Sequence, residues 1–370
     1  MTKRLVQGNE AVLLGAVHAG ATYFCGYPIS PSSEILAQAS HYAAGHSEFR
    51  FLQAEDEIAS ANAIMGASLA GAKSFTATSG PGFSLMQEAI GYGHKIGIPA
   101  VIINVMRVGP GTGMPTMPGQ GDLNQTRYGS TGDYTSLVFY PSTVAECYEY
   151  SIQAFNAAEE SRTPVILLSD AFLGHLNEVA DLDAVKVKVV PRTMEPLASG
   201  GTRLFSGVAT YADGEPATAD ADEYIRQYEE AKKHRLEVAE RYAFYEYGWN
   251  KESETLVIAF GITRRIAQPL AAHFALFRPI RIWPALDKEL VEVAGRYKKI
   301  VVIEGSDGQY ANVVERMLLR RVERVPLLGG RMSLEAIREG LDRLGLLPSE
   351  PSKAGAESPA QADAKASAVG

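Results

Sequence analysis

Three stretches in the first quarter of the chain carry the residues best suited to chemistry. They run over 27–34, 53–58 and 76–83, and each joins an apolar, strand-like run to a helix-like pattern through small, hydroxylated or acidic residues. In an open α/β sheet, ligands bind beyond the carboxyl ends of the strands. We therefore expect the three turns to meet at one site. Glu57 is its central candidate, because a positioned carboxylate can hold or transfer a proton.

Each candidate also has a plainer interpretation. Glu55, Asp56 and Glu57 form an acidic cluster at a helix start, where solvated carboxylates favour the helix dipole by about 0.3–1 kcal/mol. Ser79–Gly82 can offer backbone N–H groups to a ligand or form a tight strand-to-helix turn. Arg107, which follows the apolar run 100–106, can be a surface charge at a loop edge. The run Gly109–Gly113 lacks the helix and acidic residue of a dinucleotide-binding fingerprint, so we interpret it as an active-site or interface loop.

The composition excludes several classes of protein. A net charge of −8, with no basic stripe between aromatic residues, gives no indication of a nucleic-acid partner. Two cysteines exclude a disulfide framework and a four-cysteine iron–sulfur or zinc site built by this chain alone. The seven histidines are scattered, so no metal ligand is assigned. No signal peptide or apolar run of about 20 residues is present, and we expect a cytoplasmic protein without a membrane span.

The elements that position these residues alternate between strand and helix. Strands are expected at 21–27, 49–53, 72–78, 100–106, 138–141 and 165–169, and helices near 8–20, 32–44, 57–70, 83–93 and 143–161. This alternation is typical of a parallel sheet with helices on both faces, so the fold class is α/β with two parallel-sheet domains. The long loop after Arg107 continues to about Gly132, and loops of that length are usually functional.

The chain divides into four parts. Residues 1–180 form the first domain and 181–253 a connecting arm, with an exposed strand at 185–190 and a charged helix at 222–245. Residues 254–347 form a second α/β domain, with strands at 256–260, 280–283 and 300–303 and helices from 261 to about 277, at 288–296 and finally at 311–321. The tail, 348–370, is rich in Ala, Ser, Pro, Glu and Lys, so it is predicted to be disordered.

Several motifs in order resemble one family. These are YPISPSSE at 27–34, QAEDEIA at 53–59, TATSGPGFSLM at 76–86, NVMR at 104–107, GQGD at 119–122, RTPVILLSD at 162–170, and the segments at 283–284 and 304–309. Together they resemble the α subunit of thiamine-diphosphate-dependent 2-oxoacid:ferredoxin oxidoreductases, most closely the 2-oxoglutarate subgroup. The resemblance implies a pyrimidine-binding domain followed by a transketolase C-terminal-like domain.

The resemblance also implies roles for individual residues. Glu57 aligns with the glutamate that hydrogen-bonds the aminopyrimidine ring nitrogen of thiamine diphosphate, and Pro28, Ile29 and Ser79 are the further cofactor-binding candidates. Arg107 aligns with the arginine that binds the 1-carboxylate of the substrate. Ser30 replaces the usual threonine, whose hydroxyl helps to hold the same carboxylate.

The sequence lacks the Gly-Asp-Gly…Asn pattern that binds magnesium and diphosphate in thiamine enzymes. The resemblance therefore implies a β subunit that supplies diphosphate, Mg and a [4Fe–4S] cluster, together with ferredoxin-like and γ subunits in a dimer of heteromers. The implied reaction is oxidative decarboxylation of a 2-oxoacid with coenzyme A to acyl-CoA and CO2. Pyruvate, branched-chain and aryl 2-oxoacids stay open beside 2-oxoglutarate, as do a non-oxidative thiamine enzyme half and a non-catalytic scaffold.

Overall fold

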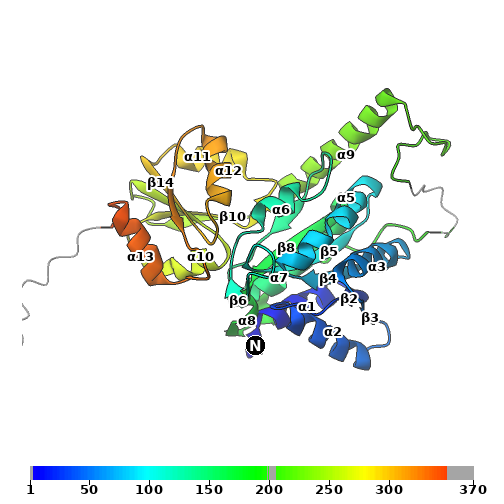
Figure 1. The fold of residues 1–370 in the computed structure, drawn as a ribbon, viewed down its shortest axis with the longest axis horizontal. Helices are drawn as coiled ribbons and strands as arrows, with labels where there is room; N and C mark the ends of the chain where they lie inside the picture. The colour runs from blue at the N-terminus through cyan, green and yellow to red at the C-terminus, as the bar shows by residue number, and fades with distance from the viewer. Residues whose placement is uncertain (1–2, 198, 200–205, 348–370) are drawn as a thin grey trace, which may run out of the picture.

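The larger of the two main sheets is built by the first half of the chain and one strand from the second half (Figure 1). The computed structural model describes residues 3–197, 199 and 206–347. The strand order is β13-β7-β8-β5-β4-β2-β3, with β6 paired to β5. Neighbours from β7 to β3 are parallel, whereas β13 and β6 are antiparallel to their partners. The strands are β2 (Tyr23–Gly26), β3 (Arg50–Gln53), β4 (Ser74–Thr78), β5 (Ala100–Val108), β6 (Met114–Pro118), β7 (Leu137–Phe139), β8 (Pro164–Asp170) and β13 (Arg281–Trp283).

Helices cover both faces of this sheet, as the continuous apolar run of β5 requires. Val101, Ile103 and Val105 pack into one core, whereas Ile102 and Met106 pack into the other. The first core is closed by α1 (Gly8–His18), α2 (Ser33–Gly45) and α7 (Val144–Ser161). The second is closed by α3 (Glu57–Leu69), α4 (Gly80–Leu85) and α5 (Gln87–Ile96). A strand buried on both faces is typical of a parallel α/β sheet.

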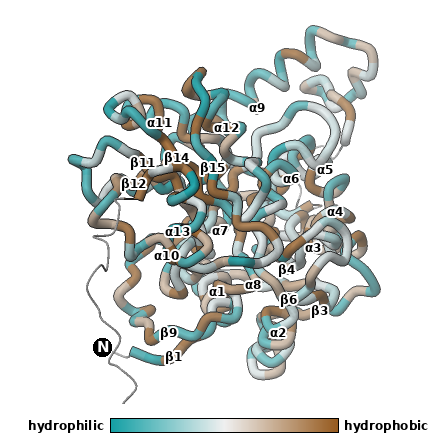
Figure 2. The backbone as a smooth tube through the Cα atoms, turned by 60° about the vertical axis from the view of Figure 1, so that its left-hand side comes forward, coloured by the Kyte–Doolittle hydropathy of each residue, from teal (hydrophilic) through white to brown (hydrophobic). Residues whose placement is uncertain are grey.

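The second main sheet has the order β10-β12-β11-β14-β15, in which only the β10–β12 pair is antiparallel. Figure 2 shows hydrophobic residues along its strands. Its strands are β10 (Tyr245–Trp249), β11 (Thr255–Ala259), β12 (Ala275–Pro279), β14 (Lys299–Glu304) and β15 (Glu323–Pro326). Its helices are α10 (Gly261–Ile266), a 3-10 turn at Gln268–Leu270, α11 (Asp287–Ala294), α12 (Gln309–Leu318) and α13 (Leu334–Arg343).

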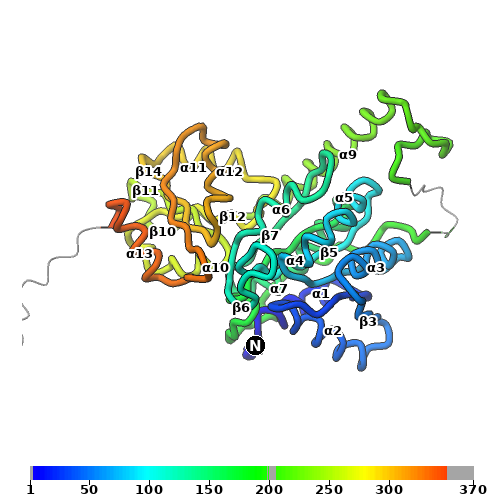
Figure 3. Tube along the Cα trace, in the orientation of Figure 1, coloured from blue at the N-terminus to red at the C-terminus, as the bar shows by residue number. Residues whose placement is uncertain are grey.

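The remaining elements connect or flank the two sheets. The strands β1 (Arg4–Gln7) and β9 (Asn177–Ala180) form a small antiparallel pair, and Figure 3 shows α9 extending from the body of the chain. These connecting elements are α6 (Leu123–Tyr128), α8 (Ala171–His175), the 3-10 turn Leu182–Ala184 and α9 (Ala221–Arg241). In the part of the chain that the structure describes, each helix is too short or too polar to cross a membrane.

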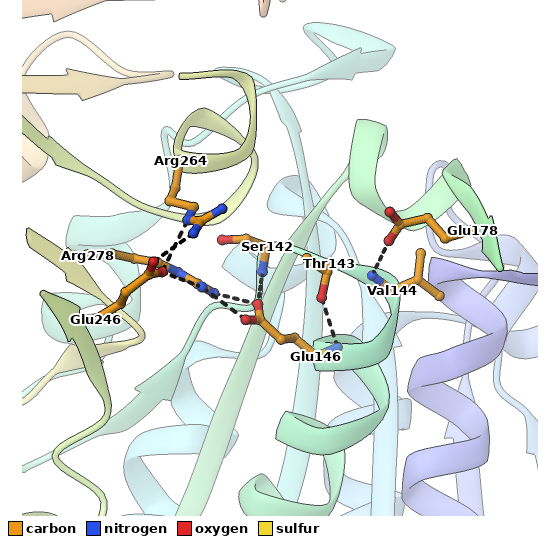
Figure 4. A network of polar contacts seen from close by, with 8 residues as sticks. All are labelled: Ser142, Thr143, Val144, Glu146, Glu178, Glu246, Arg264 and Arg278. Atoms are coloured by element: carbon orange, nitrogen blue, oxygen red, sulfur yellow. Dashed lines mark hydrogen bonds and ion pairs between the residues drawn. The ribbon is translucent and has the colours of Figure 1, made fainter. Parts of the chain in front are cut away.

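The two sheets are joined by strand β13 and by ion pairs of Arg278. β13 follows β12 in sequence but pairs with β7 at the edge of the first sheet. Figure 4 shows Arg278, which is 3% exposed, donating to Glu146 of α7 and to Glu246 of β10. Arg264 pairs with the same Glu246 at 2.7 Å. These contacts fix the second sheet against the N-terminal end of α7.

The structure corrects several predicted elements in the connecting arm and the second half. No strand forms at 185–190, because the Asn156 side chain binds the backbone of Lys188 and Val190, and Lys73 donates to the Val190 carbonyl. The helix predicted from 261 to 277 ends at Ile266. Pro269 follows in a 3-10 turn, and a proline disfavours the α conformation of the residue before it.

Other boundaries also differ from the predictions. The helix predicted at 83–93 is two helices that meet at Met86, and the loop after Arg107 contains β6 and α6. The charged helix predicted to reach residue 245 ends at Arg241, and β10 follows. The helix at 311–321 is not the last, since β15 and α13 come after it. The division into domains stays a prediction, and β13 crosses it. The predicted tail lies outside the described residues.

Candidate functional site

Glu57 lies at the first residue of α3, directly beyond the carboxyl end of β3. Asp56 caps the helix by accepting the Ala59 N–H at 2.7 Å, so it is the neighbouring carboxylate that takes the capping role. The Glu57 side chain is only 5% exposed. Burial of this kind does not fit the interpretation of Glu57 as a solvated acid.

The Glu57 carboxylate reaches the turn that follows β4. A Cβ placed on Gly82 would lie 2.2 Å from Glu57 Oε1 and 2.3 Å from Thr78 Oγ1. Only a glycine therefore leaves room for the carboxylate at this point. The contact brings two of the three predicted turns together, at one end of the parallel strands.

Burial raises the pKa of Glu57 above its ordinary value. The negative charge of Asp56 acts in the same direction, whereas a hydrogen bond from the Glu57 backbone N–H and the charge of Arg107 lower the pKa by less. Desolvation penalises the charged form, so Glu57 keeps its proton to higher pH than an exposed glutamate. The side chain is therefore suited to donating a proton to a basic ring nitrogen.

Arg107 lies near the carboxyl end of β5 and is 7% exposed. Its Nη1 donates to the Ser30 carbonyl at 2.7 Å, which adds the first turn to the site. Its Nε is buried and has no hydrogen-bond partner among the described residues. Burial lowers the pKa of Arg107, and the charges of Asp122 and Glu57 oppose that shift. The unpaired edge of the guanidinium is suited to a carboxylate.

The other predicted site residues differ in their burial and in their contacts. Ser79 is fully buried before α4, and its Oγ lacks a partner in the described part of the chain. Pro28 is exposed and Ile29 half-buried, with the Ile29 carbonyl accepting from Ser32 Oγ at 2.9 Å. Ser30 contacts Arg107 through its carbonyl, whereas the prediction concerned its hydroxyl. The binding roles of Pro28, Ile29, Ser30 and Ser79 stay predictions.

A pair of residues beside Arg107 was not identified from the sequence. Asn104 donates through Nδ2 to Asp122 Oδ2 at 3.0 Å, and Asn104 Oδ1 is buried without a partner in the described structure. Burial raises the pKa of Asp122, while the Asn104 hydrogen bond and the Arg107 charge lower it. The sequence offered one signal, the acidic residue of the 119–122 motif, but no reason to place it against Arg107.

A large cavity lies elsewhere in the structure. Its volume is about 1010 Å³, and it opens between the C-terminal ends of α5 and α7 and the helix α9. Its lining includes Tyr92, Lys95, Tyr228 and Arg235, and none of the predicted site residues. Because these helix ends lie at the opposite edge of the sheet from Glu57, the cavity is separate from the candidate site.

The site fits the pyrimidine end of thiamine diphosphate. It offers a buried carboxyl at Glu57 and, at Ser79, a buried hydroxyl that no described group satisfies. Buried polar groups are normally paired, so such atoms indicate a bound molecule or a partner. Among the described residues, no three His, Cys, Asp or Glu side chains are grouped to hold a metal ion. The fold and this half-site define the class of the protein as a thiamine-diphosphate-binding α/β chain.

The family follows from comparison with known proteins. Residues 14–243 match the family described as pyruvate flavodoxin/ferredoxin oxidoreductase, thiamine diphosphate-binding. The chain belongs to this family, which confirms the resemblance found in the sequence. It is 38% identical over 354 residues to the 2-oxoglutarate synthase subunit KorA of Archaeoglobus fulgidus, covering 92% of this chain and 98% of that one.

Two further likenesses are to a second relative and to a solved structure. The ketoisovalerate oxidoreductase subunit VorB of Methanothermobacter thermautotrophicus is 35% identical, covering 92% of this chain and 98% of that one. The structure of 2-oxoglutarate:ferredoxin oxidoreductase from Magnetococcus marinus, with 2-oxoglutarate, coenzyme A and succinyl-CoA bound, superimposes with a TM-score of 0.81 at 27% identity. The match covers 92% of this chain and 65% of that one, so this chain spans about two thirds of its length. The predicted α/β fold class is confirmed.

Proposed function

We propose that this chain is the α subunit of a 2-oxoacid:ferredoxin oxidoreductase. The complex converts 2-oxoglutarate and coenzyme A to succinyl-CoA and CO2, and the electrons released pass through a partner subunit to ferredoxin or another acceptor. The observation that carries the proposal is the pairing of two buried groups at one site. Glu57 has a carboxyl with a raised pKa, and Arg107 has a buried Nε without a hydrogen-bond partner among the described residues. A scaffold needs neither group, and burial of each without function is costly.

In this mechanism Glu57 holds a proton at its carboxyl and shares it with the aminopyrimidine ring nitrogen. Thiamine diphosphate, when held at this site, would supply a nucleophilic carbon for chemistry at the 2-oxo group. Arg107 binds the 1-carboxylate through the edge that carries Nε, while the Ser30 carbonyl holds Nη1 and fixes the plane of the guanidinium. The Ser30 hydroxyl assists at the same carboxylate. Pro28, Ile29 and Ser79 line the cofactor's pyrimidine end.

The remaining components come from partner chains. Cys25 and Cys147 are both buried and are the two cysteines of the sequence, so a β subunit supplies the [4Fe–4S] cluster as well as Mg and the diphosphate site. Exposed apolar side chains beside the site support a covering partner; they are Tyr27, Leu52, Ile58 and Leu85. Ferredoxin-like and γ subunits, a dimer of heteromers and a cytoplasmic location complete the proposal.

The relatives favour 2-oxoglutarate over the other substrates. The relative named as a 2-oxoglutarate synthase subunit is somewhat more similar to this chain than the ketoisovalerate relative. Branched-chain 2-oxoacids are the second candidate because that relative is 35% identical. Pyruvate, aryl 2-oxoacids and a non-oxidative reaction complete the set to be tested.

The test is to isolate the native complex through this chain and record its visible spectrum, subunit masses and thiamine diphosphate content. We expect a brown complex whose iron absorbance bleaches with 2-oxoglutarate plus coenzyme A. Bleaching with a branched-chain 2-oxoacid plus coenzyme A, but not with 2-oxoglutarate, would assign the branched-chain acid as the substrate. A colourless complex that contains thiamine diphosphate would indicate the non-oxidative reaction. Glu57→Gln should abolish turnover while the complex still assembles. Full turnover by this variant would refute the proposed role of Glu57.

A further inference from the structure

Gln120 connects the two sheets at a point close to Arg107. It is fully buried, and both polar atoms of its side chain are paired. Its backbone N–H donates to the Gly305 carbonyl at 2.9 Å, and its Oε1 accepts the Gly305 N–H at 2.7 Å. Its Nε2 donates to the Phe260 carbonyl at 3.0 Å and to the Tyr140 hydroxyl at 3.1 Å. Gly305 and Phe260 follow strands β14 and β11, so the second sheet holds this side chain.

The residues on either side of Gln120 contact the backbone and the charge of Arg107. Pro118 is paired with Arg107 in the β5–β6 ladder. A Cβ on Gly119 would lie 2.7 Å from the Arg107 carbonyl oxygen, so the two backbones are in close contact. Asp122 interacts electrostatically with Arg107 and accepts from Asn104 of the same strand. Residues before and after Gln120 in the loop therefore contact Arg107.

Groups from the second half of the chain hold the next turn of the loop as well. Gln309, near the start of α12, donates to the Gly121 carbonyl at 2.5 Å and accepts the Asn124 N–H at 3.0 Å. The Trp283 indole donates to the Leu123 carbonyl at 2.9 Å. Each residue from Gln120 to Asn124 therefore forms a hydrogen bond with a group from the second half of the chain, except Asp122, which interacts with Arg107.

We propose that Gln120 is a positioning residue for substrate recognition, which transmits the placement of the second sheet to the Arg107 guanidinium. This inference rests on the proposed 2-oxoacid activity. It assigns a function to a sheet that carries none of the predicted chemical groups: the sheet holds the loop that orients the carboxylate-binding arginine. The contact between the sheets is then part of the substrate site.

The expected signature is a change in the affinity for the 2-oxoacid. Gln120→Met keeps the length and volume of the side chain but removes the two side-chain donors and the acceptor. The loop then loses its register against Gly305, and the guanidinium is displaced from the substrate carboxylate. A misplacement of about 1 Å can cost up to about 100-fold in rate, and we expect KM for the 2-oxoacid to rise about tenfold. KM for coenzyme A should not change.

The experiment compares variants of the full complex, each checked for subunit content and thiamine diphosphate. Arg265→Gln is the matched control, because it removes a different contact between the same two halves, the ion pair with Glu178 at 2.5 Å. That variant should retain the KM of the unmodified complex for both substrates. Gln309→Ala removes the half-exposed anchor of the same loop and should raise KM for the 2-oxoacid by a smaller factor.

The outcomes separate the inference from the proposed function. An unmodified complex that turns over no 2-oxoacid would refute the proposed function itself. An active complex in which Gln120→Met leaves KM for the 2-oxoacid unchanged, or raises both KM values equally, would overturn the positioning role. If Gln120→Met fails to assemble, Gln309→Ala decides: a selective rise in KM supports the inference, and an unchanged KM overturns it.

Discussion

Replacing Gly82 with alanine tests the geometry of the site with a single methyl group. The new Cβ would lie 2.2 Å from Glu57 Oε1, whereas ordinary contact begins at 3.4 Å, so the carboxylate has to move by about 1.2 Å. Thr78 Oγ1, at 2.3 Å, blocks the alternative of moving the methyl group toward β4. Displacing a catalytic group by about 1 Å can cost about 100-fold in rate. We expect Gly82→Ala to lose at least that much of kcat/KM.

The stability effect of the same variant should be modest. Overpacking a buried position costs about 1–3 kcal/mol, which a urea titration of the chain would detect. Gly66→Ala is the matched control, because Gly66 lies within α3, is exposed and has no atom within 4 Å of the added Cβ. Alanine in a helix interior stabilises by about 0.5–1 kcal/mol relative to glycine, so this variant should keep full turnover. Turnover by Gly82→Ala within about threefold of the unmodified complex would refute the placement of Glu57 against Gly82.

Three further predictions concern charged groups. Arg107→Lys loses the bidentate edge, so steady-state kinetics should show KM for the 2-oxoacid raised about 10- to 100-fold with KM for coenzyme A unchanged; equal changes in both would argue against carboxylate binding. Burial raises the pKa of Asp170 to about 6 from 3.8, so its protonated form is favoured in the folded chain and stability is lost as pH rises between these values. Relative to Asp170→Asn, the free energy of unfolding should fall by about 2 kcal/mol from pH 4 to pH 6, and a constant difference would contradict this. Arg278→Met leaves the Glu146 and Glu246 carboxylates without their buried partner and should destabilise the chain by about 3–5 kcal/mol in urea; a loss below about 1 kcal/mol would show that the junction of Figure 4 is not a stabilising contact.

The first sheet could be predicted because its signals are local. Strand β5 is apolar except for Asn104 and Arg107, and short turns separate the strands from the helices that cover both faces. The same logic predicted that the turns at 27–34, 53–58 and 76–83 meet at one site, since parallel strands end at a common edge, whereas Arg107 was added by the family resemblance. The structure shows Arg107 bound to the Ser30 carbonyl, and it places Glu57 against Gly82.

The second half was predicted less well because its pairing is not local. Strand β12 lies between β10 and β11, so its structure is decided by neighbours some 20–30 residues away in the sequence rather than by its own pattern. Residues 281–283 read correctly as a strand, but nothing in them indicates that they pair with β7 of the other sheet. Val185–Val190 alternates like a strand, yet side chains of Asn156 and Lys73 take up its backbone groups.

The missed parts of the site have the same origin. Asp122 and Gln120 belong to a motif that the sequence makes visible, but their partners belong to different sheets: Asn104 lies on β5, and Gly305 follows β14. Sequence spacing cannot place a loop between two sheets whose relative position depends on contacts such as Arg278–Glu146. A chain that supplies half of a cofactor site needs that half to be rigid before the partner arrives, since ordering it on assembly would cost affinity. In the proposed function, the second sheet meets this need by fixing the loop beside Arg107. That role would account for the many contacts between the second sheet and the sheet that holds the proposed catalytic groups.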